Sequence, residues 1–309
     1  MNKKNVLTVK NLNKTYQKKG SNPVTAIENL NLSVQQGEIF GLLGPNGAGK
    51  TTFINILSGS VIKTSGFVEV WGFNLDKNPR QVRASIGIVA QDVNLDPFFT
   101  PESLLDLQAG LYGIKKKDRI TSKILNLVSL EKQAKSYARS LSGGMKRRLM
   151  VAKSLVHQPP IIILDEPTAG VDVELRQNLW KNVKTLNQEG VTIILTTHYL
   201  EEAEKMCDRI GILNKGNLVA LDTTQKLLEK IQIKKISIKV NNRVNINENK
   251  FKTLKIVSST NDEINLSYDK NELKIDQIIK LIEENGARIL DLSTDDGDLE
   301  DVFLSLTKS

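Results

Sequence analysis

The sequence contains a single cysteine, Cys207, and only two histidines among its 309 residues. One cysteine excludes an internal disulfide framework, and so few cysteine and histidine side chains exclude a zinc cluster. No apolar run approaches the roughly 18 residues that a membrane-spanning helix requires, and the N-terminal stretch MNKKNVLTVK lacks the apolar core of a signal peptide. We therefore expect a cytosolic chain, for which another chain spans the membrane if the protein works at one.

The composition is that of a globular protein with more than one domain. Of its residues, 39% are apolar and 25% are charged, which excludes a disordered or fibrous chain. The length of 309 residues is sufficient for two domains, one of them with a large core. The net charge of +8 suits either solubility or an anionic partner such as lipid or nucleic acid, and on charge alone we favour solubility.

Short apolar runs alternate with helical patterns up to about residue 222. Each run is apolar throughout rather than alternating, which is typical of strands in a parallel sheet that is covered on both faces. The runs are IFGLLG (39–44), ASIGIVA (84–90), IIILDE (161–166) and TIILTTH (192–198). This pattern predicts an α/β fold with a parallel core sheet.

Two segments depart from this alternation. Residues 92–158 contain the helical patterns PESLLDLQAGLYGI and ITSKILNLVSL, which predict an inserted helical subdomain. Residues 226–309 contain the strand patterns KKISIKV, EINLSYD and RILDLS and the amphipathic helix pattern IDQIIKLIEENG. We therefore divide the chain into a domain at 1–225 and a small α+β domain at 226–309, to which we assign a binding or regulatory role.

The segment GLLGPNGAGKTT is a phosphate-binding loop in the context that this motif requires. It contains G-x-x-x-x-G-K-T after a buried-strand run and before a helical one. The glycines let backbone amides surround the β- and γ-phosphates, Lys50 adds a mobile charge, and the Thr51 hydroxyl is a ligand for Mg²⁺. The residues expected to contact the nucleotide are Gly44, Pro45, Asn46, Gly47, Ala48, Gly49, Lys50, Thr51 and Thr52.

Polar side chains at three strand ends suit nucleotide hydrolysis. Asp165 ends a buried strand and can hold Mg²⁺, whereas Glu166 points elsewhere and can meet the attacking water. Gln91 ends another strand and offers its amide oxygen to the metal or to the water. His198 ends a third strand, where it is either a structural hydrogen-bonding residue or a sensor of the γ-phosphate.

A second anion site is predicted within SLSGGMKRR, residues 140–148. Ser142, Gly143 and Gly144 combine a hydroxyl, two unobstructed amides and the positive end of a helix dipole. This site has no lysine loop or acidic pair of its own, so it can contact a phosphate but cannot hydrolyse it. We expect the basic residues 146–148 on the solvated or phosphate-near side of the helix, the alternative being a patch that faces a membrane.

The order of these motifs resembles the ATP-binding cassette family, the nucleotide-binding subunits of ABC transporters. The resemblance covers roughly residues 5–222 and rests on GPNGAGKT, Gln91, LSGGM, ILDEP, AGVD and His198. Within it, LSGGMKRRL, DEPTAGVD and TTHYLEEAE resemble the bacterial type-2 exporter ATPases, the drug, polysaccharide and antibiotic-resistance class. The resemblance implies a P-loop NTPase cassette with an antiparallel N-terminal β part and an inserted helical subdomain, and an ATPase that uses ATP and Mg²⁺.

The resemblance also implies a division of the site between two chains. Ser142 and Gly144 would contact the γ-phosphate of ATP held by a second copy, and Asp172 would lie at the interface between the copies. Two ATP molecules would join this head-to-tail homodimer, and hydrolysis would release it. The motion would drive a transmembrane permease subunit, with the chain placed in the cytoplasm against the inner face of the cell membrane.

Four further roles are implied residue by residue. Tyr16 would stack on adenine, the alternative being an ordinary surface tyrosine. Glu166 would be the general base or would orient the water, His198 would read the γ-phosphate, and Gln91 would couple the site to the permease. Met145 stands where many members of the family have glutamine, and we expect activity to survive this departure because the serine and glycines are intact.

Other interpretations stay open at this point. A soluble cassette ATPase that acts on nucleic acid or the ribosome would suit the positive charge, but the coiled coil, second cassette and zinc cysteines usual there are missing from this sequence. A third possibility is a binding regulator whose C-terminal domain senses a ligand. The segment 94–113 is either the permease dock, with Phe98 and Phe99 as apolar anchors, or part of the core of the helical subdomain.

Overall fold

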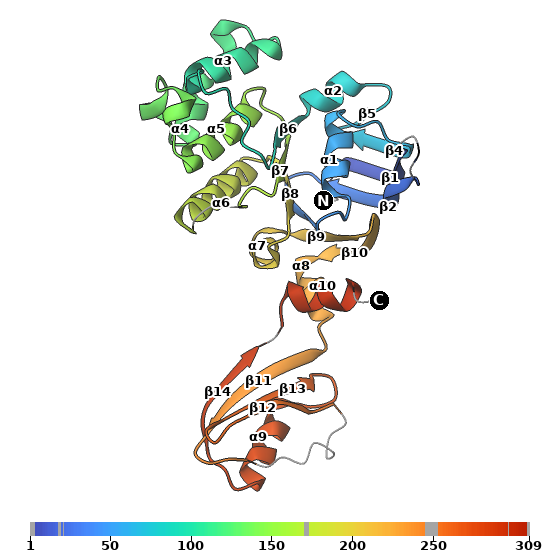
Figure 1. Ribbon diagram of the computed structural model, residues 1–309, viewed down its shortest axis with the longest axis vertical. Coiled ribbons are helices and arrows are strands. Elements are labelled where there is room, and N and C mark those ends of the chain that lie inside the picture. Colours follow the sequence, from blue (N-terminus) through green and yellow to red (C-terminus); the bar gives the residue numbers. More distant parts are fainter. Residues whose placement is uncertain are drawn as a thin grey trace. The chain divides into compact units, whose positions relative to one another are not determined.

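The computed structural model describes residues 4–17, 20, 22–169, 173–244, 253–295 and 297–307. The chain forms two compact units, Met1–Thr223 and Thr224–Ser309, which are described here one at a time (Figure 1). None of the helices in the described ranges combines the length and the apolar character needed to cross a lipid bilayer.

A six-stranded sheet forms the centre of the first unit. Its order is β10-β9-β3-β8-β7-β6, and only the pair of β9 and β10 is antiparallel. The strands are β3 (Ile39–Leu43), β6 (Ile86–Val89), β7 (Ile161–Asp165), β8 (Thr192–Thr197), β9 (Arg209–Asn214) and β10 (Asn217–Thr223). Every residue of β3, β7 and β8 is buried, which confirms the predicted α/β fold with a parallel core sheet. The carboxyl ends of these parallel strands lie at one edge of the sheet.

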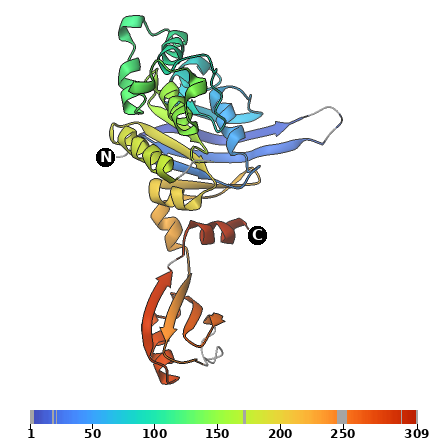
Figure 2. The same cartoon turned by 60° about the vertical axis from the view of Figure 1, so that its left-hand side comes forward.

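A second, antiparallel sheet is built mainly from the N-terminal residues. Its order is β2-β1-β4-β5, and the long strands β1 and β2 lie side by side in Figure 2. The strands are β1 (Asn5–Tyr16), β2 (Val24–Gln35), β4 (Ser65–Val70) and β5 (Phe73–Asn74). Their buried residues, such as Leu12, Leu30 and Val68, share one apolar core with Phe40 of β3 and Phe53 of α1 (Lys50–Ser58). This core fixes the start of α1 between the two sheets.

Helices occupy the connection from β6 to β7. They are α3 (Pro101–Leu111), η1 (Lys116–Asp118), α4 (Thr121–Leu127), η2 (Glu131–Gln133), η3 (Ala138–Ser140) and α5 (Gly143–Leu155). Thr100 caps α3 by accepting a hydrogen bond from the amide of Ser103, and Ser142 caps α5 by accepting one from the amide of Met145. The remaining helices of this unit are α2 (Pro79–Ala84), α6 (Val173–Gln188) and α7 (Leu200–Met206).

The second unit is a small α+β fold. Its antiparallel sheet has the order β12-β13-β11-β14, and α9 packs on one face of it. The elements are α8 (Thr224–Glu229), β11 (Ile233–Val240), β12 (Lys255–Ser259), β13 (Glu263–Asp269), α9 (Ile275–Glu284), β14 (Ile289–Asp295) and α10 (Leu299–Thr307). Ile278 and Ile282 of α9 are buried against Ile236 and Leu266, which face each other across β11 and β13. The amphipathic pattern of the sequence thus forms this second core.

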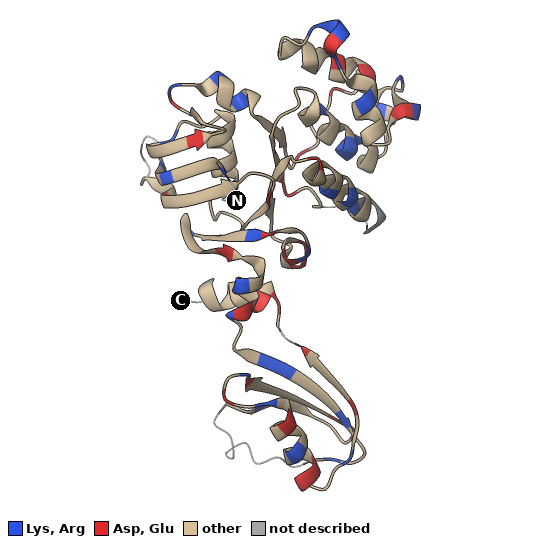
Figure 3. Cartoon of the chain, turned by 180° about the vertical axis from the view of Figure 1, so that it is seen from behind, with Lys and Arg blue, Asp and Glu red and all other residues tan. Residues whose placement is uncertain are grey.

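Charged residues are interspersed over the described chain. Figure 3 shows lysine and arginine on both units, with aspartate and glutamate among them. The interpretation of the net charge of +8 as a contribution to solubility stays a prediction.

Candidate nucleotide-binding site

The loop between β3 and α1 lies directly against neighbouring backbone. A Cβ atom at Gly44 would come within 2.4 Å of the carbonyl oxygen of Leu213, and one at Gly49 within 2.5 Å of that of Ala26. Gly49 also has a φ of 107°, which disfavours any residue with a side chain. The loop therefore needs glycine at both positions to follow this path. Residues 45–52 line a cavity of about 160 Å³ in front of the N-terminus of α1, where amides and the helix dipole favour an anion.

Substitution of Gly44 by Ala is expected to displace this loop. The added methyl group would clash with the backbone of Leu213 and with Ala48, so we expect a loss of about 1–3 kcal/mol in the free energy of unfolding and weaker nucleotide binding. Thermal unfolding and titration with a fluorescent ATP analogue measure the two effects. Gly110→Ala is the matched control, because a Cβ atom at Gly110 in α3 would meet only the end of the Arg119 side chain and Gly110 does not line the cavity. It should leave nucleotide binding unchanged and should not lower the free energy of unfolding.

Lys50 begins α1 and turns back into the loop. Its Nζ donates hydrogen bonds to the carbonyl oxygens of Gly44 (2.6 Å) and Pro45 (3.2 Å), and it lies 3.7 Å from Oε1 of Glu166. Burial lowers the pKa of the Lys50 ammonium, and the carboxylates of Glu166 and Asp165 oppose this shift. The ammonium group of Lys50 thus lines the cavity, where an incoming phosphate can reach it.

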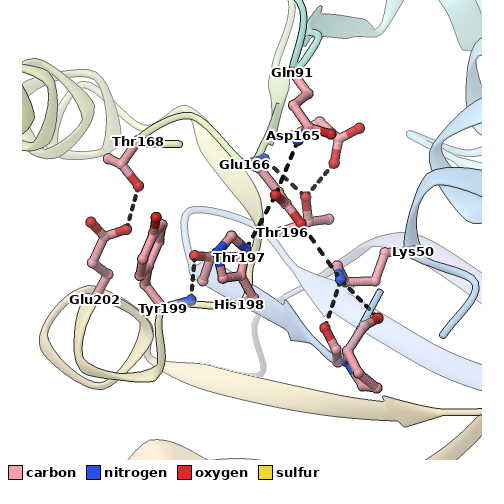
Figure 4. A network of polar contacts seen from close by, with 12 residues as sticks. Lys50, Gln91, Asp165, Glu166, Thr168, Thr196, Thr197, His198, Tyr199 and Glu202 are labelled. Carbon is pink, nitrogen blue, oxygen red and sulfur yellow. Dashed lines mark hydrogen bonds and ion pairs between the residues drawn. The ribbon is translucent and has the colours of Figure 1, made fainter. Parts of the chain in front are cut away.

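The carboxylate of Glu166 is the point where the predicted catalytic residues meet (Figure 4). Its Oε2 lies 3.2 Å from Nδ1 of His198 and accepts a hydrogen bond from Nε2 of Gln91 at 3.3 Å. Lys50 approaches the other oxygen. Glu166 itself has a φ of 45°, and its amide donates to the carbonyl oxygen of Thr196 at 3.0 Å, which holds the turn after β7. The residues that follow β6 and β8 and the first residue of α1 therefore all contact the carboxylate that follows β7.

Asp165, the last residue of β7, makes a different side-chain contact from Glu166. Its Oδ1 accepts a hydrogen bond from the hydroxyl of Thr196 at 2.5 Å. Burial raises the pKa of Asp165, and the Thr196 hydrogen bond opposes this rise. Thr196 was not predicted as a site residue, although it lies directly opposite Asp165 in the parallel register of β7 and β8. A polar residue opposite the acid on the next strand is the signal that identifies it.

The structure does not bring the second anion site to this cavity. Ser142 and Gly143 are exposed at the start of α5 and do not line the cavity, whereas Gly144 is buried. Tyr16 is also outside the lining: it ends β1 opposite Val24, with Nζ of Lys14 over its ring at 4.6 Å. Asp172, expected at an interface between copies, lies outside the described residues.

The expectation that residues 146–148 face solvent or phosphate is wrong for Arg147. Its side chain is only 6% exposed, and its guanidinium donates hydrogen bonds to the carbonyl oxygens of Gln91 (2.5 Å) and Glu166 (2.7 Å). The spacing of Gly144, Arg147 and Val151, three and four residues apart, places all three on the buried side of α5. This spacing of three and four residues is the feature of the sequence that indicates a buried position for Arg147.

Comparison with known proteins agrees with this geometry. Residues 27–169 match the ABC transporter family. The linearmycin resistance ATP-binding protein LnrL of Bacillus subtilis (strain 168) is 33% identical over 98% of this chain and 98% of its own length. The Nod factor export ATP-binding protein I of Ralstonia nicotianae is 37% identical over 72% of this chain and 68% of that protein.

Solved structures show the same fold. An ATP-binding subunit of an ABC transporter aligns with a TM-score of 0.65 and 29% identity, over 73% of this chain and 92% of its own. A dimeric ATP-binding cassette in a post-hydrolysis state, bound to ADP and Pi, aligns with a TM-score of 0.63 and 28% identity, over 71% of this chain and 98% of its own. The cassette resemblance of the sequence is confirmed. The chain belongs to the ABC transporter family, as an ATP-binding subunit with ATPase activity.

Proposed function

We propose that the chain drives an exporter as a head-to-tail pair, in which each ATP lies between the phosphate loop of one copy and the start of α5 of the other. The observation that carries this proposal is the exposure of Ser142 and Gly143 outside the cavity of their own chain. The Ser142 hydroxyl accepts a hydrogen bond from Met145 and keeps its proton for a phosphate oxygen. Gly144 would add its amide at the same helix start, and Asp172 would lie at the interface.

Within one chain, hydrolysis is assigned to the residues around Glu166. Lys50 would exchange its carbonyl partners for the β- and γ-phosphates, because a charge-assisted bond is stronger than a bond to a neutral carbonyl. Glu166 would orient the attacking water and take its proton, held in place by Gln91 and His198. His198 would also sense the γ-phosphate, and Tyr16 would stack on the adenine.

Three oxygen donors of the site fit Mg²⁺, a hard cation that prefers oxygen ligands. They are the hydroxyl of Thr51, the carboxylate of Asp165 and the amide of Gln91. Since Nε2 of Gln91 donates to Glu166, Oε1 is the atom that Gln91 has left for a metal. When bound, the ion would neutralise charge on the phosphates.

The mechanical output is assigned to a separate membrane-spanning permease. Two relatives are named for Nod factor export and linearmycin resistance, which supports an export function. The proposed dock is the segment 94–113, in which Phe98 is 69% exposed and Phe99 is half-buried. A groove of about 380 Å³ lies beside it, lined by Asn94 and Tyr112 among others. The chain would then sit at the cytoplasmic face of the membrane, with residues 1–225 as the ATPase domain and 226–309 as a regulatory domain.

Replacement of Phe98 by Asp is expected to weaken binding to the permease at least tenfold, because it places a charge where an apolar anchor would become buried in the proposed complex. The measurement is capture of tagged chain with detergent-solubilised membranes, followed by identification of the membrane-spanning protein retained. Ile62→Asp is the matched control, since Ile62 is 84% exposed and lies outside the proposed dock. Retention of no membrane-spanning protein by the unsubstituted chain would contradict the proposed function.

A further inference from the structure

Arg147 is a buried arginine whose hydrogen bonds all go to main-chain carbonyls. Nη1 donates to the carbonyl oxygens of Ala90 (3.1 Å) and Gln91 (2.5 Å), Nη2 to that of Glu166 (2.7 Å), and Nε to that of Pro167 (3.0 Å). One guanidinium thus joins the end of β6 to the turn after β7. The side chains of Gln91 and Glu166, which these two segments carry, meet at 3.3 Å.

The shape of the guanidinium makes this junction rigid. Its donors lie in one plane at fixed angles, so four bound carbonyls are held in a fixed arrangement relative to one another. If the group were removed, these carbonyls would be left without partners in a largely buried setting, and the two segments would shift to satisfy them. A shift of the order of 1 Å at the carboxylate of Glu166 is enough to lower the rate of hydrolysis substantially.

Arg147 also lies on the helix that presents the second anion site. Gly144 precedes it by three residues on the buried side of α5, and Ser142 caps the same helix. Under the proposed function, Ser142 to Gly144 act on the ATP of the partner chain. Arg147, by contrast, reaches back to Gln91 and Glu166 of its own chain. Residues of the same first part of α5 would therefore act on two different nucleotide pockets, Ser142 to Gly144 on that of the partner chain and Arg147 on that of its own chain.

We propose that Arg147 is a positioning residue for hydrolysis: it fixes the peptide groups of Gln91 and Glu166 in its own chain and so aligns the carboxylate with the attacking water. The positioning role rests on the contacts of this chain alone. The contrast between the two pockets rests on the proposed head-to-tail pair.

The first test compares Arg147→Met and Arg147→Lys with a neighbouring arginine. Arg147→Met should lower kcat roughly 10- to 100-fold and change KM for ATP less than about threefold, because the groups that bind phosphate stay in place. Arg147→Lys should give an intermediate kcat, since lysine keeps the charge but loses the fork. Arg148→Met is the matched control: Arg148 donates to the carbonyl oxygens of Val128 and Ser129, both at 2.9 Å, and not to the site.

A kcat of Arg147→Lys equal to that of the unsubstituted chain would overturn the proposal, as would an equal loss in Arg148→Met. Arg147→Lys decides the matter even where the methionine variant does not fold. Nucleotide-binding stoichiometry, measured on each variant, separates a slower site from a smaller folded fraction.

The second test asks on which chain Arg147 acts. Mixed pairs are formed with two affinity tags and followed through one turnover. A chain carrying both Arg147→Met and Glu166→Gln, paired with an unsubstituted chain, should yield a single ADP per pair. In a pair of an Arg147→Met chain with a Glu166→Gln chain, neither pocket should form ADP at the rate of the first pair. The first chain has lost the alignment of its carboxylate, and the second has lost the carboxylate that takes the proton. Equal ADP from both pairs would overturn the proposal, and failure of any chains to pair in ATP would contradict the head-to-tail function instead.

Discussion

Replacement of Glu166 by Gln is expected to lower ATP hydrolysis about 100- to 10,000-fold while ATP binding persists, so that an ATP-bound pair accumulates. The amide has nearly the shape of the carboxylate, and it can keep a hydrogen-bonding contact with Gln91 or His198. It cannot take a proton from water. Phosphate release measures the rate, and light scattering with and without ATP measures pairing.

The matched control for this variant is Glu202→Gln. Glu202 is also a buried acid, but it accepts from the hydroxyl of Thr168 at 2.7 Å and pairs with Arg176 at 3.3 Å, away from the cavity. Its neutralisation should change the rate of hydrolysis by less than about threefold. Hydrolysis by Glu166→Gln at the original rate would remove Glu166 from the catalytic role.

Replacement of Lys50 by Ala is expected to weaken ATP binding roughly 100-fold or more. The loss corresponds to two charge-assisted hydrogen bonds to phosphate, each worth about 1.5–3 kcal/mol. Folding should survive, because burial lowers the pKa of Lys50 and its charged form is therefore less favourable in the folded chain than in the unfolded one. Titration with a fluorescent ATP analogue and thermal unfolding of the free protein measure the two effects.

Lys63→Ala provides the comparison for this variant. Lys63 pairs with Asp76 at 3.0 Å and does not line the cavity, so its loss should leave ATP affinity unchanged. If Lys50→Ala bound ATP as tightly as the unsubstituted chain, the loop between β3 and α1 would not be the nucleotide site.

The features that sequence reasoning predicted best are those set by one local rule. Residues 161–164 are apolar because β7 is buried on both faces, and 263–269 alternate because β13 has one face against α9. The phosphate loop is recognised from the short motif at residues 44–51, although its glycines are required by contacts with the distant backbone of Leu213 and Ala26. Each of these features, the two strands and the phosphate loop, was therefore predicted from one short pattern in the sequence.

The features that were missed depend on contacts between distant segments. In the sequence, Arg147 is part of a basic run. Its partners are the main-chain carbonyls of Gln91 and Glu166, which every residue type possesses, so the side chains at these positions do not reveal the contact. Thr196 becomes informative only when the register of β8 on β7 is known. Strand β12, Lys255–Ser259, was not predicted because most of its residues are exposed and show no apolar face. The roles of the site residues stay predictions.

The claim that each ATP pocket is shared between two copies is tested most directly by mixing two inactive chains. Lys50→Ala removes the phosphate loop, and Gly143→Asp places a negative charge against the γ-phosphate at a helix start where aspartate is compatible with folding. Neither variant should hydrolyse ATP alone. In a mixed pair, one pocket combines an intact loop with an intact α5 start, so activity should return on mixing. A mixture that stays as inactive as its two components would contradict the shared pocket.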